Sequence, residues 1–189
     1  MRYLGNILFI LFSLIFLTYL SLPNLSFPDP PPGAVQSFEP ADSETPDRRG
    51  YLTDLSRDEV LDHYSDGYKL SMMGIEIPSY QLIYPPEDAF SLVRDQTRST
   101  HLREIVYPFR ESLFVNEFVA KLDKDAISYK GIHYGAKITV SIKRSSLVSR
   151  IGVGVLILSA IYILTIQLKV VFLSLWSSVK MLRWPWFWN

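Results

Sequence analysis

Two uncharged apolar runs stand near the two ends of the 189-residue sequence. Residues 3–22 and residues 151–168 contain no Asp, Glu, Lys or Arg. A helix of about 20 residues is roughly 30 Å long, which matches the hydrocarbon core of a bilayer. Because a buried helix of a soluble protein rarely stays uncharged over about 18 residues, the pattern predicts two transmembrane helices. We expect the second span to cover residues 151–172, with Lys169 reaching the interface through its alkyl chain.

The alternative interpretation of the first run is a cleaved secretory signal peptide. Arg2 gives the run a basic start, but the apolar stretch exceeds the usual length of about 7–15 residues. The following residues, SLPNLSFP, contain no small residues in the Ala-x-Ala pattern of a cleavage site. We therefore interpret residues 1–22 as an uncleaved transmembrane anchor.

Residues 23–50 are rich in proline and acidic residues and predict a linker. The stretch holds seven prolines and five carboxylates. Proline fixes φ and removes a backbone donor, so a helix or a central strand is not expected here. We expect a semi-rigid, extended spacer rather than a proline-rich ligand for a partner.

A capped helix is predicted over residues 56–66, near the start of the soluble domain. Ser56 suits the N-cap position, and Glu59 three residues later completes a capping box. Gly67 then ends the helix. The apolar face of this helix consists of Val60, Leu61 and Tyr64.

The next stretch alternates between strand and helix signals. Residues 75–84 have strand character that Pro78 interrupts, so we expect an edge strand or an extended connection. A second helix is expected to begin at Pro86. The apolar spacing resumes at Leu102, so we expect either a separate further helix or a kinked continuation of this one, ending before Pro108. The inward-facing positions of the second helix are Ala89, Phe90 and Val93.

After Pro108 the apolar pattern changes to the two-residue period of strands. Residues 113–118 alternate, residues 126–134 predict a hairpin around Lys130-Gly131, and residues 137–143 alternate cleanly. In the last strand we expect one face to be in the core and the other to face away. The core face is Ile138, Val140 and Ile142, and the opposite face is Thr139 and Ser141.

Helices followed by strands with short connections predict an α+β fold for residues 51–145. We expect a small antiparallel sheet with two or three helices on one face, flanked by N- and C-terminal transmembrane helices.

The C-terminal stretch, residues 173–189, combines tryptophans with basic residues. Amphipathic rings and positive charges suit the headgroup layer of a bilayer. We therefore expect an interfacial tail rather than a hydrophobic tail that binds a partner. The residues expected at the membrane interface are Trp176, Lys180, Arg183, Trp184, Trp186 and Trp188.

Charge is distributed unevenly along the chain. All 19 acidic residues lie between the two apolar runs, whereas both outer ends carry only basic residues. Arg2 precedes the first run and the next basic residue is Arg48, so the positive-inside rule favours a cytoplasmic N-terminus. The opposing bases Lys143, Arg144 and Arg150 count for less, because a long loop translocates largely regardless of charge. We expect a two-span cell-membrane protein with both termini cytoplasmic and the central domain extracytoplasmic.

The sequence offers little catalytic chemistry. It contains no cysteine, and its histidines, His63, His101 and His133, do not stand at metal-ligand spacing. A nucleophile elbow and a glycine-rich phosphate loop are also missing. The segment between the spans is not basic overall, so no nucleic-acid partner is expected. We expect no metal, no cofactor and no catalytic residue.

The densest polar stretch is residues 94–112. Arginines beside hydroxyl groups can clamp a phosphate or a carboxylate. The nearly balanced charge of the stretch also fits ordinary ion pairs and caps. We take Arg94, Arg98 and Arg110 as the candidate ligand-binding residues.

Three stretches, ETPDRR (44–49), YPPEDAFSLVRDQTRST (84–100) and YPFRESLFVNEF (107–118), resemble a group of uncharacterised two-span envelope proteins of candidate-phyla bacteria. The resemblance extends over roughly residues 40–165. It implies a bacterial envelope location, but no activity and no catalytic residue.

These observations predict a non-enzymatic, membrane-tethered interaction or accessory domain on the extracytoplasmic side of the cell envelope. Its expected partners are the lipid bilayer and another envelope protein. The alternative is a membrane-associated enzyme or an anion-binding protein. It would act on lipid or cell-wall intermediates through the Arg94–Ser112 patch.

Overall fold

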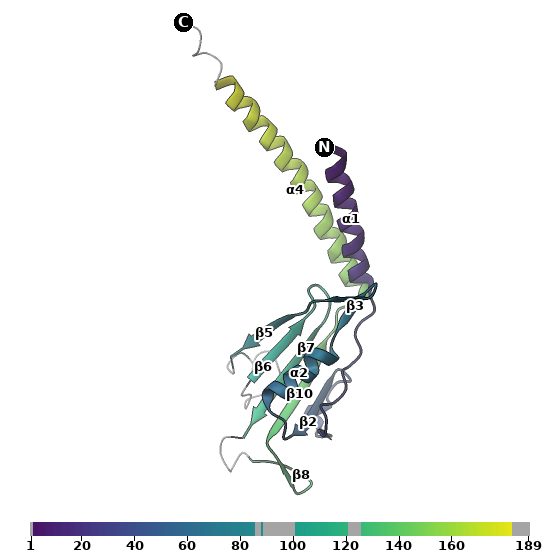
Figure 1. The fold of residues 1–189 in the computed structure, drawn as a ribbon, viewed down its shortest axis with the longest axis vertical. Coiled ribbons are helices and arrows are strands. Elements are labelled where there is room, and N and C mark those ends of the chain that lie inside the picture. The colour runs from purple at the N-terminus through teal and green to yellow at the C-terminus, as the bar shows by residue number, and fades with distance from the viewer. Residues whose placement is uncertain (1, 86–87, 89–100, 121–125, 183–189) are drawn as a thin grey trace. The chain divides into compact units, whose positions relative to one another are not determined.

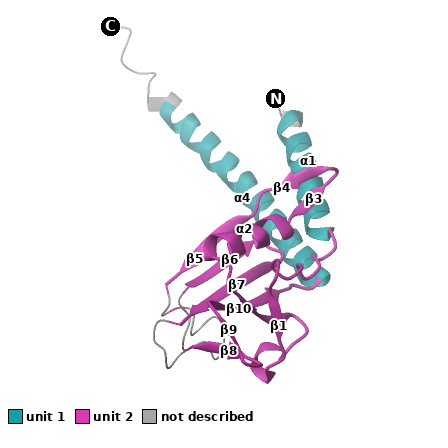
Figure 2. Ribbon diagram, turned by 60° about the horizontal axis from the view of Figure 1, so that its bottom comes forward, with its two compact units in different colours: residues 1–21, 147–189 teal, residues 22–146 magenta. Residues whose placement is uncertain are grey.

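The computed structural model describes residues 2–85, 88, 101–120 and 126–182. The chain divides into two compact units, coloured separately in Figure 2. Residues 1–21 and 147–189 form the terminal unit, and residues 22–146 form the central domain.

The terminal unit consists of two long apolar helices, α1 (Arg2–Ser21) and α4 (Leu147–Leu182). The windows Leu4–Ser21 and Leu147–Val179 are long and apolar enough to cross a membrane. Only 6% of the first window and 11% of the second are buried within the protein. A core helix of a soluble protein would be mostly buried, so this exposed apolar surface fits a two-span membrane protein.

Helix α4 continues without a break through residues 173–182. The first part of the stretch expected to be a separate tail therefore belongs to this helix. A 36-residue helix is roughly 54 Å long, more than the hydrocarbon core requires. Trp176 is exposed, and its ring stacks on Phe172 with centroids 6.3 Å apart. Interfacial contact of this part stays a prediction. The side chain of Lys180 and all of Arg183, Trp184, Trp186 and Trp188 lie outside the described residues.

The central domain is built on a six-stranded antiparallel sheet with the order β1-β2-β10-β7-β6-β5. One helix, α2 (Arg57–Gly67), lies across a face of this sheet (Figure 1). Two short hairpins, β3–β4 and β8–β9, form separate two-stranded sheets. The expected α+β class with an antiparallel sheet is confirmed. The strands of the large sheet are β1 (Val35–Ser37), β2 (Arg48–Thr53), β5 (Tyr80–Tyr84), β6 (His101–Val106), β7 (Ser112–Val119) and β10 (Ala136–Lys143). The hairpin strands are β3 (Leu70–Met72), β4 (Ile75–Ile77), β8 (Ile127–Tyr129) and β9 (Ile132–Tyr134).

The predicted cap of α2 is confirmed. The Ser56 hydroxyl accepts a hydrogen bond from the backbone N–H of Glu59, and the Glu59 carboxylate accepts one from the N–H of Ser56 at 2.8 Å. The apolar side of the helix is buried, as its spacing predicted, with Val60, Leu61 and Tyr64 inward. The Gln81 amide of β5 donates to the Ser65 hydroxyl, which ties the helix to the edge of the sheet.

The two faces of β10 do not differ in burial as expected. Ile138, Val140 and Ile142 are in the core, but Thr139 and Ser141 are also buried, with 3% and 8% of their surface exposed. The expectation that this second face points away from the protein is wrong. Alternation shows which side chains share a face, but it cannot show whether the second face is also covered.

Residues 101–106 form strand β6, so the helical segment expected from Leu102 is wrong. The strand pairs with β5 on one side and with β7 on the other. These ladders outweigh the local helical spacing of the apolar residues, because strand formation depends on its neighbours. The helix expected from Pro86, with Ala89, Phe90 and Val93 inward, lies outside the described residues.

The segment 75–84 and the final hairpin follow their predictions more closely. Pro78 separates β4 from β5, and β5 is an edge strand of the large sheet. Lys130 and Gly131 form the turn between β8 and β9, each with positive φ.

The expected acidic spacer, residues 23–50, is instead packed into the central domain. It contains β1, the 3-10 helix η1 (Pro40–Asp42) and the start of β2. Basic side chains of the domain pair with several of its carboxylates, which offsets the repulsion among them. Lys137 binds Glu39 and Asp42, while Arg144 binds Asp47.

Candidate functional site

The turn between β6 and β7 is joined by hydrogen bonds to distant segments of the central domain. The backbone N–H of Arg110 donates to the carbonyl of Tyr107 at 3.0 Å, which closes a four-residue turn. Pro108 stands second in this turn, and Phe109 stands third with a φ of 62°. This is the pattern of a type II turn, in which the third residue is usually Gly or Asn. An exposed phenylalanine in this position is therefore unusual.

Arg110 fastens the start of the domain to this turn. Its side chain is fully buried, and its guanidinium donates to the carbonyls of Leu22 at 3.0 Å and Pro23 at 2.8 Å. It also donates to the Glu111 carboxylate at 2.7 Å. That carboxylate in turn accepts the N–H of Leu25. These carbonyl and carboxylate acceptors compensate for the desolvation of the buried guanidinium charge.

The end of the domain reaches the same turn. The hydroxyl of Ser145 donates to the carbonyl of Arg110 at 2.6 Å. Residues 22–25 and residue 145 are thus held by one short segment, although they are more than a hundred positions apart. We call the part of the domain around the Tyr107–Glu111 turn the span end, because α1 ends at Ser21 and α4 begins at Leu147.

The β3–β4 hairpin is anchored at the span end by Tyr107. The Tyr107 hydroxyl donates to the carbonyl of Tyr68 at 3.0 Å and accepts the N–H of Leu70 at 2.9 Å. Burial, together with the nearby Glu111 carboxylate, raises the pKa of Tyr68. The hairpin reverses at Met73-Gly74, where both residues have positive φ.

The β8–β9 hairpin lies at the opposite end of the domain, which we call the far end (Figure 1). It precedes β10, and β10 runs from there to Lys143, which pairs with Ser112 beside the Tyr107–Glu111 turn. Its turn residues, Lys130 and Gly131, have φ values of 52° and 82°, close to the 54° and 80° of Met73 and Gly74. The domain therefore carries the same kind of tight turn at both ends.

The three candidate ligand-binding arginines are only partly described. Arg94 and Arg98 lie outside the described residues, and Arg110 is buried and bonded to Leu22, Pro23 and Glu111. In the described part of the stretch, strand alternation separates the polar side chains. Arg103 donates to Gln81 on the α2 side, whereas Glu104, on the opposite face, accepts the Tyr84 hydroxyl. That hydrogen bond to Glu104 raises the pKa of Tyr84 to about 12.

The histidines occupy separate surroundings. The His63 ring nitrogen Nε2 lies 3.0 Å from the carbonyl oxygen of Asp29. Burial and the positive charge of Arg57 lower the pKa of His101. His133 lies on β9 at the far end. Among the described residues, no three His, Asp or Glu side chains gather in a group that could hold a metal ion.

Strand β5 is an edge of the large sheet with an uncharged sequence, YQLIY. Its side chains Tyr80, Leu82 and Ile83 are exposed. Among the described strands it pairs only with β6, so its outer backbone edge faces no described strand. The opposite edge, β1, has only three residues and runs into Pro40.

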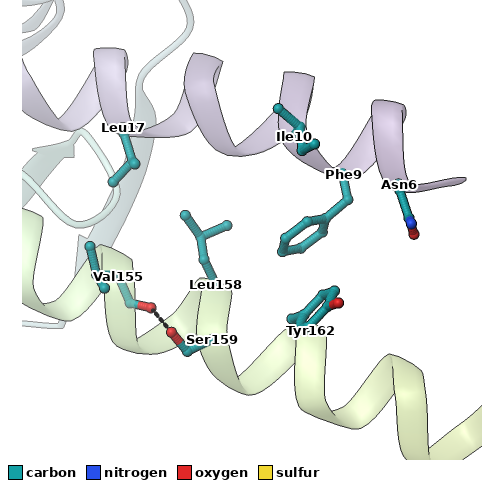
Figure 3. A pocket seen from close by; sticks show the side chains of 8 residues that line it. All are labelled: Asn6, Phe9, Ile10, Leu17, Val155, Leu158, Ser159 and Tyr162. Atoms are coloured by element: carbon teal, nitrogen blue, oxygen red, sulfur yellow. Dashed lines mark hydrogen bonds between the residues drawn. The ribbon is translucent and has the colours of Figure 1, made fainter. Parts of the chain in front are cut away.

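In the terminal unit, a groove of about 490 Å³ lies between α1 and α4 (Figure 3). The rings of Phe9 and Tyr162 face each other across it with centroids 5.6 Å apart. Closer to the domain-side ends of these helices, Gly154 leaves room for Leu20, which a side chain there would meet. Small residues allow such close helix contacts in membranes. The Ser159 hydroxyl donates to the carbonyl of Val155, so the lining is largely apolar.

No protein-family model, curated protein or solved structure matches this chain. The candidate sites therefore depend on their geometry alone. Sequence reasoning missed Tyr107, Phe109 and Glu111, and it missed the apolar turn residue Met73. The signals were present as a proline in the second position of YPFR and as a Met-Gly pair between two short apolar runs.

Proposed function

We propose that this chain is a non-catalytic, membrane-tethered accessory domain of the bacterial cell envelope that binds another envelope protein. The two apolar terminal helices support the tethering. The short connections at the span end support a domain that is held beside the bilayer, where it meets partners in the same membrane rather than freely diffusing molecules.

The single observation that carries the proposed binding role is the exposed edge strand β5. An uncharged edge strand offers backbone N–H and C=O groups to a strand of another protein. Proteins usually protect such edges with lysine, proline or a very short strand. The β1 edge is protected in this way, whereas β5 has five uncharged residues with exposed apolar side chains. Strand addition by a partner is the binding mode that fits β5.

The Ile83→Lys variant tests this role in the full chain. Ile83 is 65% exposed, so a lysine is tolerated by the fold but places a charge at the proposed partner contact. We expect chemical cross-linking in intact membranes to lose a specific adduct in this variant. The matched control is Ile132→Lys on β9, where the isoleucine is 58% exposed at the far end. Equal cross-linking in both variants would contradict the proposal.

The proposed side of the membrane is extracytoplasmic, supported by the positive-inside pattern, in which Arg2 precedes the first span and the next basic residue is Arg48. A protease tag inserted between Lys130 and Gly131 should be cut in intact spheroplasts, whereas one appended after Asn189 should be spared. Protection of the tag at the β8–β9 turn in sealed spheroplasts would place the domain in the cytoplasm.

A further inference from the structure

We propose that the span end of the central domain contacts the lipid surface, with Phe109 and Met73 inserted among the headgroups of the bilayer that α1 and α4 cross. This inference rests on the proposed membrane tethering. It adds a second membrane contact, made by the folded domain itself.

Short chain connections join this end of the domain to the two apolar helices. Arg110 binds the carbonyl of Leu22, one residue after the end of α1, and Ser145, two residues before α4, binds back to Arg110. Each residue extends the chain by about 3.8 Å. The headgroup region adds roughly 5–8 Å on each side of the hydrocarbon core. Because these connections are short, the turn that holds them is confined to the vicinity of the bilayer surface.

Two large apolar residues occupy strained backbone positions at this end. Phe109 has a φ of 62° and is 56% exposed, and Met73 has a φ of 54° and is 92% exposed. Backbone in this region favours Gly, Asn or Asp and disfavours other residues. In water, the almost fully exposed Met73 side chain gains little at such a position that would offset this preference. At a lipid surface it gains the free energy of transferring its apolar area out of water.

The hairpin has the amphipathic form that an interfacial contact requires. The strand register pairs Met72 with Ile75 on one face and Ser71 with Glu76 on the other. Ile75 is exposed on the apolar face, next to Met73 at the tip. One side of the hairpin can therefore face the lipid surface while the other stays hydrated.

The β8–β9 hairpin supplies the internal comparison. It has the same two-residue turn with the same positive φ values, but Lys130 stands where the span end has Met73. A lysine fits a turn that faces water. Basic charge at the span end is placed differently: Lys143, at the end of β10, is exposed and can meet anionic headgroups beside the apolar residues.

The chain lacks cysteine, so single cysteines can carry a fluorophore without competing sites. We suggest the full-length variants Met73→Cys, Phe109→Cys, Lys130→Cys and Leu14→Cys, each labelled with an environment-sensitive dye. They are reconstituted in vesicles of phosphatidylethanolamine and phosphatidylglycerol. A nitroxide on the lipid headgroup should quench positions 73 and 109 several-fold more than position 130. A nitroxide deep in the acyl chain should quench position 14.

The outcomes separate the two proposals. Quenching at position 14, together with quenching at positions 73 and 109 no stronger than at position 130, would overturn the lipid contact and leave the tethering intact. Loss of quenching at position 14 would overturn the tethering itself. If positions 73 and 109 are shielded from both the headgroup nitroxide and aqueous iodide, a protein covers them and the lipid contact is wrong. Similar headgroup quenching at positions 73 and 109 would show that the result does not come from a folding defect in one of the two variants.

Discussion

The span end and the far end of the central domain use one turn geometry with opposite side chains. Met73-Gly74 and Lys130-Gly131 differ by only two degrees in φ at each position. A two-residue hairpin of this kind constrains the backbone and accepts several residues at its first position. The difference between methionine and lysine is therefore not required by the turn, and we attribute it to the surroundings of each end.

The two ends also differ in what holds them together. The span end depends on the buried Arg110–Glu111 pair, whose partners in residues 22–25 are distant in sequence. Around the far end, α2 begins with a local cap formed by Ser56 and Glu59, and Lys137 is paired with carboxylates near β1. A fully buried pair with distant partners fastens the span end, whereas the far end combines a local cap with ion pairs of the partly exposed Lys137. Four predictions test this comparison.

The largest effect is expected from Arg110→Ala. It leaves the buried carboxylate of Glu111 without its guanidinium and frees the carbonyls of Leu22 and Pro23. Breaking a buried ion pair from one side typically costs about 3–5 kcal/mol. Urea unfolding of the full chain in mild detergent measures the loss. The control is Arg144→Ala, which removes a half-buried pair with Asp47 and should cost about 1 kcal/mol or less. Similar losses in both variants would show that the span end is not specially held.

Gly50→Ala should have the next largest effect. The new methyl carbon would lie 2.5–2.8 Å from the side chain of Asp42, which Ser37 and Lys137 hold in place. Overpacking of this kind typically costs about 1–3 kcal/mol. In Gly135→Ala the nearest atom, in Asp54, is 3.5 Å away, so that variant serves as the control. An unchanged free energy of unfolding in Gly50→Ala would mean that η1 can move away from β2.

Ser56→Ala tests the local cap at the start of α2. Loss of an N-cap typically costs about 1 kcal/mol, which the same unfolding experiment detects. Hydrogen bonding from Ser56 lowers the pKa of Glu59 from 4.5. A carboxylate with a lowered folded pKa stabilises above its unfolded pKa, and this contribution disappears as the pH falls through the folded value. The wild-type chain should therefore lose more stability between about pH 5 and pH 3 than Ser56→Ala does. Parallel pH profiles would argue against the cap.

The smallest effect on stability is expected from Met73→Asn and Lys130→Asn. Asparagine suits positive φ, so both variants should be neutral or more stable in detergent by about 0.5 kcal/mol or less. The comparison becomes sharp in vesicles, where only Met73→Asn removes an apolar side chain from the proposed lipid contact. Headgroup quenching of a dye at position 109 should fall in Met73→Asn and stay unchanged in Lys130→Asn. Equal behaviour in vesicles would remove the distinction between the two ends.

Several elements were predictable because their signals lie within a few residues of one another. The α2 cap is formed by Ser56 and Glu59, three positions apart, and the β8–β9 turn depends on Lys130-Gly131. The alternation of residues 137–143 identified β10 for a similar reason, since the two-residue period is a property of the strand itself. The candidate arginine site was less predictable, because the contacts of Arg110 reach residues up to 88 positions away.

The sequence by itself determined the two long apolar helices, the capped helix α2 and the α+β composition, because charge, length and short-range spacing are local properties. The tertiary structure decided the rest. It placed residues 23–50 in the domain by pairing their carboxylates with distant bases, and it made residues 101–106 a strand between two neighbours. It also brought Arg110 into hydrogen bonds with both ends of the central domain. Such contacts depend on which distant segments are neighbours in space, and short-range sequence patterns do not predict this.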